Sequence, residues 1–325
     1  MPENVQTTGA VPATTMRARM KAPEWGALLI FLLAEVVFFT INSPYFLSWP
    51  NIVNIITALS ITGILAAGGT ILLIAGQFDL SVGSGTAFVA LMFAIAAQSL
   101  GIMPAVGVAV LVGLGIGMLN GFLVTVIGVN ALITTLGTLA IFRGLTLSIG
   151  GASSVRINGF DWAIARPFLD IPLSAVLFVV IAVVIAILLS RTVFGRTIYA
   201  IGANENAARL VGIRTKKTLF LGFVISGVCM AITGLVSASQ LGSTSGTTGT
   251  GLELAVVTAI ILGGTSLKGG MGSMFGTVLG LLIVGVLNNG MTLMNINSTW
   301  QQVAAGTLLI LAVSFDQIRQ RYVRA

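Results

Sequence analysis

Histidine is absent from the 325 residues of this chain, and cysteine occurs once, at Cys229. A Ser-His-Asp triad and an imidazole metal site therefore cannot form, and one thiol supports neither a disulfide framework nor a thiolate metal site. No Gly-x4-Gly-Lys-Ser/Thr phosphate loop occurs either, so we expect this polypeptide to bind no ATP itself. The sequence offers little material for catalysis, and we predict that the chain is not an enzyme.

Charged residues are also scarce, at 8% of the chain, whereas hydrophobic residues make up 56% and the mean hydropathy is +1.05. Soluble domains carry about 25% charged residues, so this composition excludes a soluble globular protein. Apolar runs of about 20 residues, the length that a helix needs to cross a bilayer, recur along the chain. The 40 glycines fit the same interpretation, because small residues let membrane helices pack closely.

The apolar runs predict an all-α polytopic membrane protein with about ten spans. The membrane domain is expected over 25–318, between a polar tail at 1–24 and a short tail at 319–325. The basic residues before the first run could imitate a signal peptide, but we favour an uncleaved span, because the run is long and no small-x-small pattern follows it. The spans are expected to begin near Trp25, Ile52, Gly83, Pro104, Ala131, Leu173, Thr218, Leu254, Gly272 and Thr299.

The basic residues are strongly biased to one side of these spans. An even number of spans places both termini on one side, and that side carries thirteen of the sixteen lysines and arginines. Arg156 and Arg166 fall in a loop on the other side, and Arg143 lies within the fifth span. The positive-inside rule then predicts a multi-pass protein of the cell membrane with both termini in the cytoplasm. The thirteen are Arg17, Arg19, Lys21, Arg191, Arg196, Arg209, Arg214, Lys216, Lys217, Lys268, Arg319, Arg321 and Arg324.

An internal repeat becomes visible when the chain is shifted by 169 residues, which lays Asn120 on Asn289 without a gap. The matches place the fourth and fifth spans on the ninth and tenth, which cross in opposite directions, as in two pseudo-symmetric inverted halves. Chance similarity between helices rich in Gly and Leu is the alternative. The residues with an identical counterpart are Asn120, Gly121, Ile127, Gly137, Thr138, Leu139 and Ile141.

The segment 75–84 places an acid, Asp79, at the junction of the second and third spans. A carboxylate accepts amide hydrogen bonds and suits the positive end of a helix, so Asp79 could cap the third helix, with Gly83 and Ser84 easing the bend. Alternatively, broken helix ends line a polar pathway here, where irregular backbone is tolerated. The sequence leaves both interpretations open.

The loop at 191–217 contains a short predicted helix with both boundary signals. Asn204 can serve as N-cap, Glu205 suits the first turn, and Gly212 can take the left-handed position after the helix. A helix of about two turns gains its stability mainly from docking, so its apolar face predicts a partner surface. An ordinary solvated basic loop is the alternative. The apolar face consists of Ala207, Ala208, Leu210 and Val211.

Three motifs together resemble the permeases of ribose- and xylose-type monosaccharide ABC importers. They are Asp-Leu-Ser-Val-Gly within 76–83, the segment 195–213, and Leu-Gly-Gly-Thr-Ser-Leu-Lys-Gly-Gly at 262–270, and the resemblance runs over 51–316. Two departures leave the exact sugar open. Asn130-Ala131-Leu132 stands where the family usually has a proline and an aromatic residue, and Gly76-Gln77-Phe78-Asp79 replaces the usual Gly-Gly-Ile-Asp.

The resemblance implies a permease that forms the translocation pathway for a pentose, a hexose or a related polyol. It implies a second permease subunit, in a homodimer or a heterodimer, and an extracytoplasmic binding protein that delivers the sugar. It also implies a separate cytoplasmic ATPase that binds ATP and Mg²⁺, while this chain holds no cofactor or metal and binds no nucleic acid. The segment that couples to the ATPase would include Gly202, Asn204, Glu205, Ala208, Arg209 and Gly212.

Amide side chains at membrane depth are candidates for contact with a hydroxyl-rich ligand, because they both donate and accept hydrogen bonds. Hydrogen bonds between helices are the alternative role for each. Asp79 joins them as a pathway candidate, whereas Glu35, Arg143 and Glu253 are expected to pair or cap rather than bind substrate. The amide candidates are Asn54, Gln77, Asn120, Asn130, Asn288, Asn289, Gln301 and Gln302.

Glycines recur every four residues in two spans and predict smooth helix faces for tight packing. They are Gly113, Gly117 and Gly121, with Gly272, Gly276 and Gly280 as counterparts.

Two other transporter functions stay open at this point. The chain could be a permease for branched-chain amino acids or nucleosides, although its pathway candidates are mostly amides rather than charged groups. It could also be an ion-coupled transporter that needs no ATPase, in which case Asp79 and Glu35 would have to carry the coupling.

Overall fold

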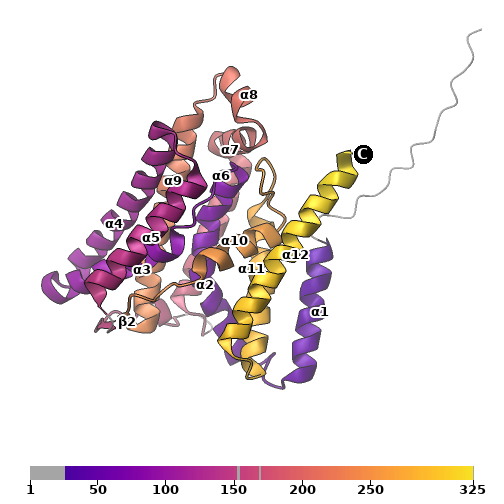
Figure 1. Ribbon diagram of the computed structural model, residues 1–325. Coiled ribbons are helices and arrows are strands. Elements are labelled where there is room, and N and C mark those ends of the chain that lie inside the picture. Colours follow the sequence, from indigo (N-terminus) through magenta and orange to yellow (C-terminus); the bar gives the residue numbers. More distant parts are fainter. Residues whose placement is uncertain (1–25, 152–153, 168–169, 325) are drawn as a thin grey trace, which may run out of the picture.

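The computed structural model describes residues 26–151, 154–167 and 170–324, so the predicted tail at 1–24 lies outside the described part. The described chain is almost entirely helical (Figure 1). The helices are α1 (Gly26–Asn42), α2 (Trp49–Ile74), α3 (Val82–Leu100), α4 (Ile102–Phe122), the π-helix η1 (Leu123–Ile127), α5 (Ala131–Gly150), the 3-10 helix η2 (Trp162–Ile164), α6 (Leu173–Arg191), α7 (Val193–Ala203), α8 (Glu205–Leu210), α9 (Thr215–Leu241), α10 (Leu252–Leu262), α11 (Met274–Leu293) and α12 (Ser298–Arg324).

A helix begins within a few residues of each of the ten predicted span starts. In the described part, seven helices are long and apolar enough to cross a membrane: α2, α3, α4 with η1, α5, α6, α9 and α11. Helix α10, at the eighth predicted span, has only 11 residues. At 1.5 Å per residue it extends about 17 Å, roughly half of the ~30 Å hydrocarbon core. The eighth expected span is therefore a half-length helix that begins inside the protein.

One end of the bundle is organised around α7 and α8 and is called the α7 end here (Figure 1). The last residue of α2, Ile74, accepts a hydrogen bond from the Gly270 amide at 2.7 Å, and Tyr199 of α7 donates to the Gly272 carbonyl at 2.8 Å, just before α11. Helix α9 starts beside α8, where Thr215 bonds to Glu205. Helix α2 therefore ends at the α7 end, whereas α9 and α11 start there and run away from it.

The two halves of the chain pack as an inverted repeat. Helix α4 packs on α3 and α9, and its counterpart α11 packs on α10 and α2. Likewise α5 packs on α3, and α12 packs on α10. Exchanging α2 with α9, α3 with α10, α4 with α11 and α5 with α12 thus reproduces the contacts, and the paired helices run in opposite directions. The repeat predicted from the shift of 169 residues is confirmed, since Asn120 and Asn289 lie on α4 and α11.

Both ends of the described chain lie toward the α7 end. Helix α1 leads through a short connection to the far end of α2, and Gly290 in the last turn of α11 packs against Phe39 in the last turn of α1. Helix α12 then returns, so its C-terminal end points toward α7 and α8 (Figure 1). At the far end, β1 (Val155–Arg156) pairs antiparallel with β2 (Ser243–Thr244), which follows α9. Arg156 is thus separated from the basic residues of α7, α8 and the start of α9.

The glycine series on α4 lets this helix approach α9 closely, as the spacing predicts. A methyl group on Gly117 would meet the Gly227 Cα of α9 at 2.9 Å, and one on Gly227 would meet the Gly117 Cα at the same distance. On α11, Gly276 and Gly280 face the end of α10 in the same way. Gly272 does not belong to this helix face, because it lies in the loop before α11 with φ +151. That loop bends sharply after α10, so the four-residue spacing is no helix period there.

The contact between α4 and α9 makes a stability prediction. Gly117→Val places a branched side chain against the α9 backbone, and we expect overpacking to lower the unfolding free energy by about 1–3 kcal/mol. Gly115→Val is the matched control, because Gly115 lies on the same helix with no atom within 4 Å of an added methyl group. Thermal unfolding in detergent checks both variants. Equal melting temperatures for the two would contradict the close approach.

Candidate functional site

Helix α8 is a capped helical turn on the surface of the α7 end. The Asn204 side chain accepts a hydrogen bond from the Ala207 amide at 3.0 Å, as expected of an N-cap. After the helix, Gly212 has φ +86, its amide bonds to the Arg209 carbonyl, and the Ile213 amide bonds to the Ala208 carbonyl at 3.1 Å. This pair of hydrogen bonds around a glycine with left-handed backbone is a Schellman motif. Both predicted boundary signals of the helix are confirmed.

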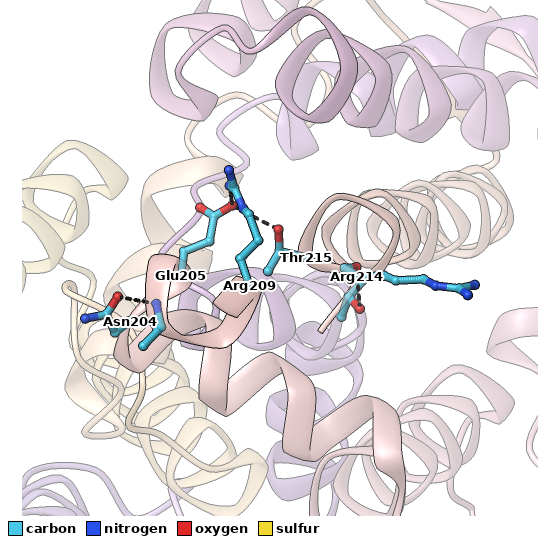
Figure 2. Close-up of polar contacts among 7 residues, drawn as sticks. Asn204, Glu205, Arg209, Arg214 and Thr215 are labelled. Atoms are coloured by element: carbon cyan, nitrogen blue, oxygen red, sulfur yellow. Dashed lines mark hydrogen bonds and ion pairs between the residues drawn. The ribbon is translucent and has the colours of Figure 1, made fainter. Parts of the chain in front are cut away.

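Glu205 forms an ion pair within α8 and a hydrogen bond to the start of α9. Glu205 accepts from Arg209 at 2.8 Å, one helical turn away, and from the Thr215 hydroxyl at 3.2 Å (Figure 2). Figure 2 shows the Arg214 side chain pointing away from this cluster. An exposed pair at this spacing contributes only ~0.3–0.5 kcal/mol. Its role is therefore to set the direction of α8 rather than to stabilise the fold.

The apolar face of α8 is split between the protein and the outside. Ala208 is buried, whereas Leu210 and Val211 are 88% and 78% exposed. Two large apolar side chains next to basic residues, at the tip of a six-residue helix, form a surface that a partner protein can cover. Of the four residues predicted to dock, Leu210 and Val211 are thus presented outward.

Helix α7 was not predicted from the sequence, yet it connects α8 to the membrane helices. Its N-cap is Thr192, whose hydroxyl accepts from the Gly195 amide, and its inner face is buried Ile198 and Ile201. Phe194, Ile198 and Ile201 recur at helical spacing, and that pattern could have revealed the helix. The phenol of Tyr199 bonds to the Gly272 carbonyl, and burial raises the pKa of Tyr199, which keeps it a neutral donor.

Gly202 brings the end of α7 into backbone contact with both halves. A methyl group on Gly202 would collide with the Ile74 carbonyl of α2 and with the Gly270 amide before α11. Gly269 packs from the other side, with the position of its absent methyl 2.8 Å from the Gly76 amide. The end of α7 therefore lies between the α2–α3 junction and the α10–α11 loop, so a displacement of α7 is transmitted to both.

Asp79 is buried in a hydrogen-bond network that joins three helices. One carboxylate oxygen accepts from the Ser81 amide at 3.1 Å and the Ser81 hydroxyl at 2.6 Å, and the other accepts from Ser226 of α9 at 2.8 Å. Asn120 of α4 donates to the Ser81 hydroxyl at 2.9 Å. Asp79 is not the cap of α3, because Ser81 holds the N-cap position. The capping interpretation is corrected, since the carboxylate bonds to the cap residue and to α9 instead.

The two repeat-related amides both make contacts between helices. Asn120 is fully buried and bonds to Ser81, while Asn289 exchanges two hydrogen bonds of 2.9 and 2.8 Å with Asn51 of α2. Asn51 also donates to the Phe46 carbonyl. These bonds are the structural alternative to substrate contact. The partners Ser81, Ser226 and Asn51 were missed, because nothing in their sequence spacing indicates which helix they face.

The other amide candidates do not gather at one place. Asn130 caps α5 by accepting from the Leu132 amide, and Gln301 donates to Thr292. Asn288 has a buried side-chain oxygen that accepts no hydrogen bond from the described residues. Exposure differs widely across the set: Asn54 and Gln302 are exposed, and Gln77 is half-buried.

The ionisable residues at membrane depth have distinct environments. Arg143 of α5 donates to the carbonyls of Gly246 and Thr248, at 3.0 and 2.8 Å, and thereby holds the loop before α10. Glu253, in the first turn of α10, faces Gly83 of α3 rather than the outer surface. Within the described ranges, no three His, Cys, Asp or Glu side chains gather closely enough to hold a metal ion.

Comparison with known proteins identifies the relatives of this architecture. The family model described as "Branched-chain amino acid transport system / permease component" matches residues 51–313. The chain is 36% identical to the D-allose transport system permease protein of Escherichia coli (strain K12) over 302 residues, which cover 91% of this chain and 92% of the relative.

Two further relatives match over a similar extent. The L-arabinose transport system permease protein of Escherichia coli (strain K12) is 37% identical over 328 residues, which cover 99% of each chain. The ribose import permease protein of Bacillus subtilis (strain 168) is 36% identical over 298 residues, which cover 89% of this chain and 90% of the relative. No solved structure gives a significant match.

The Asp79 network makes a second prediction. Asp79→Ala leaves the Ser81 and Ser226 donors without their acceptor, and we expect the unfolding free energy to fall by about 1–3 kcal/mol. Asp79→Asn keeps one acceptor oxygen, so its unfolding free energy should lie between those of the wild type and Asp79→Ala. Asp161→Ala, at an exposed acid, is the control. Thermal unfolding in detergent ranks the variants, and a wild-type melting temperature for Asp79→Ala would contradict the role of the network.

Proposed function

This chain belongs to the branched-chain amino acid transport system / permease component family, and from that premise we propose that it is the membrane subunit of an ATP-driven monosaccharide importer. The observation that carries the proposal is the match, over 89–99% of the chain, to permeases named for allose, arabinose and ribose. The chain forms the translocation pathway for a pentose, a hexose or a related polyol. It catalyses no reaction itself.

A separate cytoplasmic ATPase binds ATP and Mg²⁺ and docks on α8. Exposed Leu210 and Val211 supply an apolar contact, and the exposed ion pair of Arg209 with Glu205 borders it. The connection through α7 supports this role, because Gly202 lies against the end of α2 in one repeat half and the α10–α11 loop in the other. Closure of the ATPase would then reach the α2–α3 junction of one half and the α10–α11 loop of the other, the two halves whose relative movement gives alternating access.

Two further partners complete the importer. A second permease subunit, identical or related, covers part of the exposed apolar surface, and the lipid bilayer covers the rest. An extracytoplasmic binding protein delivers the sugar at the far end, where β1 and β2 pair. We infer that both termini are cytoplasmic, because the basic residues of α7, α8 and α9 gather at the end where α1 begins and α12 ends.

Transport and coupling are tested together. The complete importer is reconstituted in vesicles with its ATPase and binding protein, and the uptake of labelled ribose, allose and L-arabinose is measured. We expect ATP-dependent uptake of at least one of these sugars. Leu210→Asp should abolish uptake and the stimulation of ATP hydrolysis by the binding protein, because a carboxylate replaces the apolar contact with the ATPase.

The control for this variant is Ile127→Asp at the end of η1, which packs on α9 away from β1 and β2, and where the side chain is also 59% exposed. It should keep the stimulation of ATP hydrolysis. Wild-type uptake by the Leu210→Asp importer would argue against docking at α8. Uptake that persists without the ATPase would instead favour an ion-coupled transporter.

Orientation is tested by cysteine labelling, since the native Cys229 is buried and should not react. Asn206→Cys on α8 introduces an exposed thiol at the α7 end, and Asn158→Cys after β1 introduces one at the far end. We expect an impermeant maleimide to label Asn158→Cys in spheroplasts and Asn206→Cys only in inside-out vesicles. The reverse pattern would place the α7 end outside the cell.

A further inference from the structure

The segment 243–253, which holds most of the connection from α9 and the first two residues of α10, is unusually rich in hydroxyl groups and enters the protein interior. It reads Ser-Thr-Ser-Gly-Thr-Thr-Gly-Thr-Gly-Leu-Glu and is called the hydroxyl loop here. At its start, β2 pairs with β1 at the far end of the bundle. At its end, the Gly249 carbonyl lies against Gly83, in the first turn of α3. The loop therefore leads from the far surface to the start of the half-length helix α10.

Contacts from neighbouring helices hold this backbone in place. Arg143 of α5 binds the Gly246 and Thr248 carbonyls through one guanidinium nitrogen, and its other N–H groups make no hydrogen bond that the described residues account for. Gly249 and Gly83 approach each other so closely that a methyl group on either would meet the other's carbonyl at 2.8 Å. A polar segment fixed in this way is preorganised, since little further ordering is needed when a ligand binds.

Several polar atoms of the hydroxyl loop have hydrogen-bonding capacity that the described residues do not use. The Thr247 and Thr250 side chains are exposed, and Thr250 uses its proton on the Thr247 carbonyl, which leaves its oxygen as an acceptor. Glu253 spends one oxygen on the Gly251 amide at 3.3 Å, and its other oxygen is buried without a partner among the described residues. The hydroxyl of Thr244, a residue that is only 2% exposed, also has no hydrogen-bond partner among the described residues. Buried polar atoms of this kind generally have a partner, so these two call for one.

We propose that the hydroxyl loop, with Arg143 and Glu253, is the site at which the permease contacts the hydroxyl groups of its sugar. This inference rests on the proposed function. A sugar hydroxyl both donates and accepts, so it can donate to the free Glu253 oxygen and accept from the guanidinium of Arg143, and hydrogen bonds to charged groups are the stronger ones. The positive N-terminal end of α10 adds amide donors at the same place. Irregular backbone between inverted halves is also where such transporters can admit a ligand.

The test measures sugar imported per ATP hydrolysed, with the reconstituted importer and the sugar that its wild type transports. We expect Glu253→Gln to lower this ratio about tenfold, as the loss of one hydrogen bond to a charged group would, and Thr247→Val combined with Thr250→Val to lower it at least about threefold, as the loss of neutral hydrogen bonds would. ATP hydrolysis stimulated by the binding protein should persist, because α7 and α8 are unchanged.

Matched controls exist on α1. Glu35 is also a buried acid with an unpartnered oxygen, and Thr40 is an exposed threonine that donates to a main-chain carbonyl. Glu35→Gln and Thr40→Val should keep the wild-type ratio. Wild-type ratios for Glu253→Gln and for the double threonine variant would overturn the proposed site while leaving the importer intact. If the wild type shows no ATP-dependent uptake of any pentose, hexose or related polyol offered to it, the proposed function fails and this inference fails with it.

Monodeoxy analogues of the transported sugar separate direct contact from a structural role of Glu253. If Glu253 contacts one sugar hydroxyl directly, the wild type transports the analogue that lacks this hydroxyl slowly. The Glu253→Gln importer then transports that analogue at the same rate as the wild type does. Uniform slowing of Glu253→Gln across all analogues would show that Glu253 shapes the loop without touching sugar, and would overturn the assignment.

Discussion

The architecture depends on one backbone contact, in which Gly202 of α7 lies against the Ile74 carbonyl and the Gly270 amide. Ile74 and Gly270 are themselves joined by a hydrogen bond of 2.7 Å. No side chain separates these three segments. Flexible side chains between them would let each segment slide past the others, whereas direct backbone contact does not. The end of α2, the loop before α11 and the surface helices thus behave as one connected unit.

This unit links the surface of α8 to the polar interior. The α2–α3 junction begins right after Ile74, and within it Asp79 bonds to Ser81 and to Ser226 of α9, while Asn120 of α4 joins through Ser81. Buried polar groups are tolerated in an apolar protein only when they find partners, so this network allows few alternative arrangements of α3, α4 and α9. Movement at α8 would therefore reach helices of both halves as a coordinated shift.

Sequence reasoning identified most helices but not how some of them end. Seven of the ten predicted spans are helices long and apolar enough to cross a membrane in the described part. The inverted repeat and the caps at Asn204 and Gly212 were also confirmed, because each follows from local hydrophobicity, spacing or turn chemistry. Helix α7 was missed, because a short amphipathic helix in a basic loop resembles solvated chain. The half-length of α10 and the partners of Asp79 were not foreseen, because both depend on segments distant in sequence, namely Gly83 and Ser226.

The sequence alone determined that this is a polytopic helical membrane protein with a capped surface helix, because hydrophobic length and capping residues act locally. It also predicted which side collects the basic residues, since all of them except Arg143 lie outside the predicted spans. Only the tertiary structure decided which polar side chains meet. Asn120 and Asn289 occupy equivalent repeat positions yet bind Ser81 and Asn51, and the loop before α10 is held by Arg143 of α5. A hydrogen bond needs two groups within about 3 Å, and helix packing rather than sequence spacing brings these groups together.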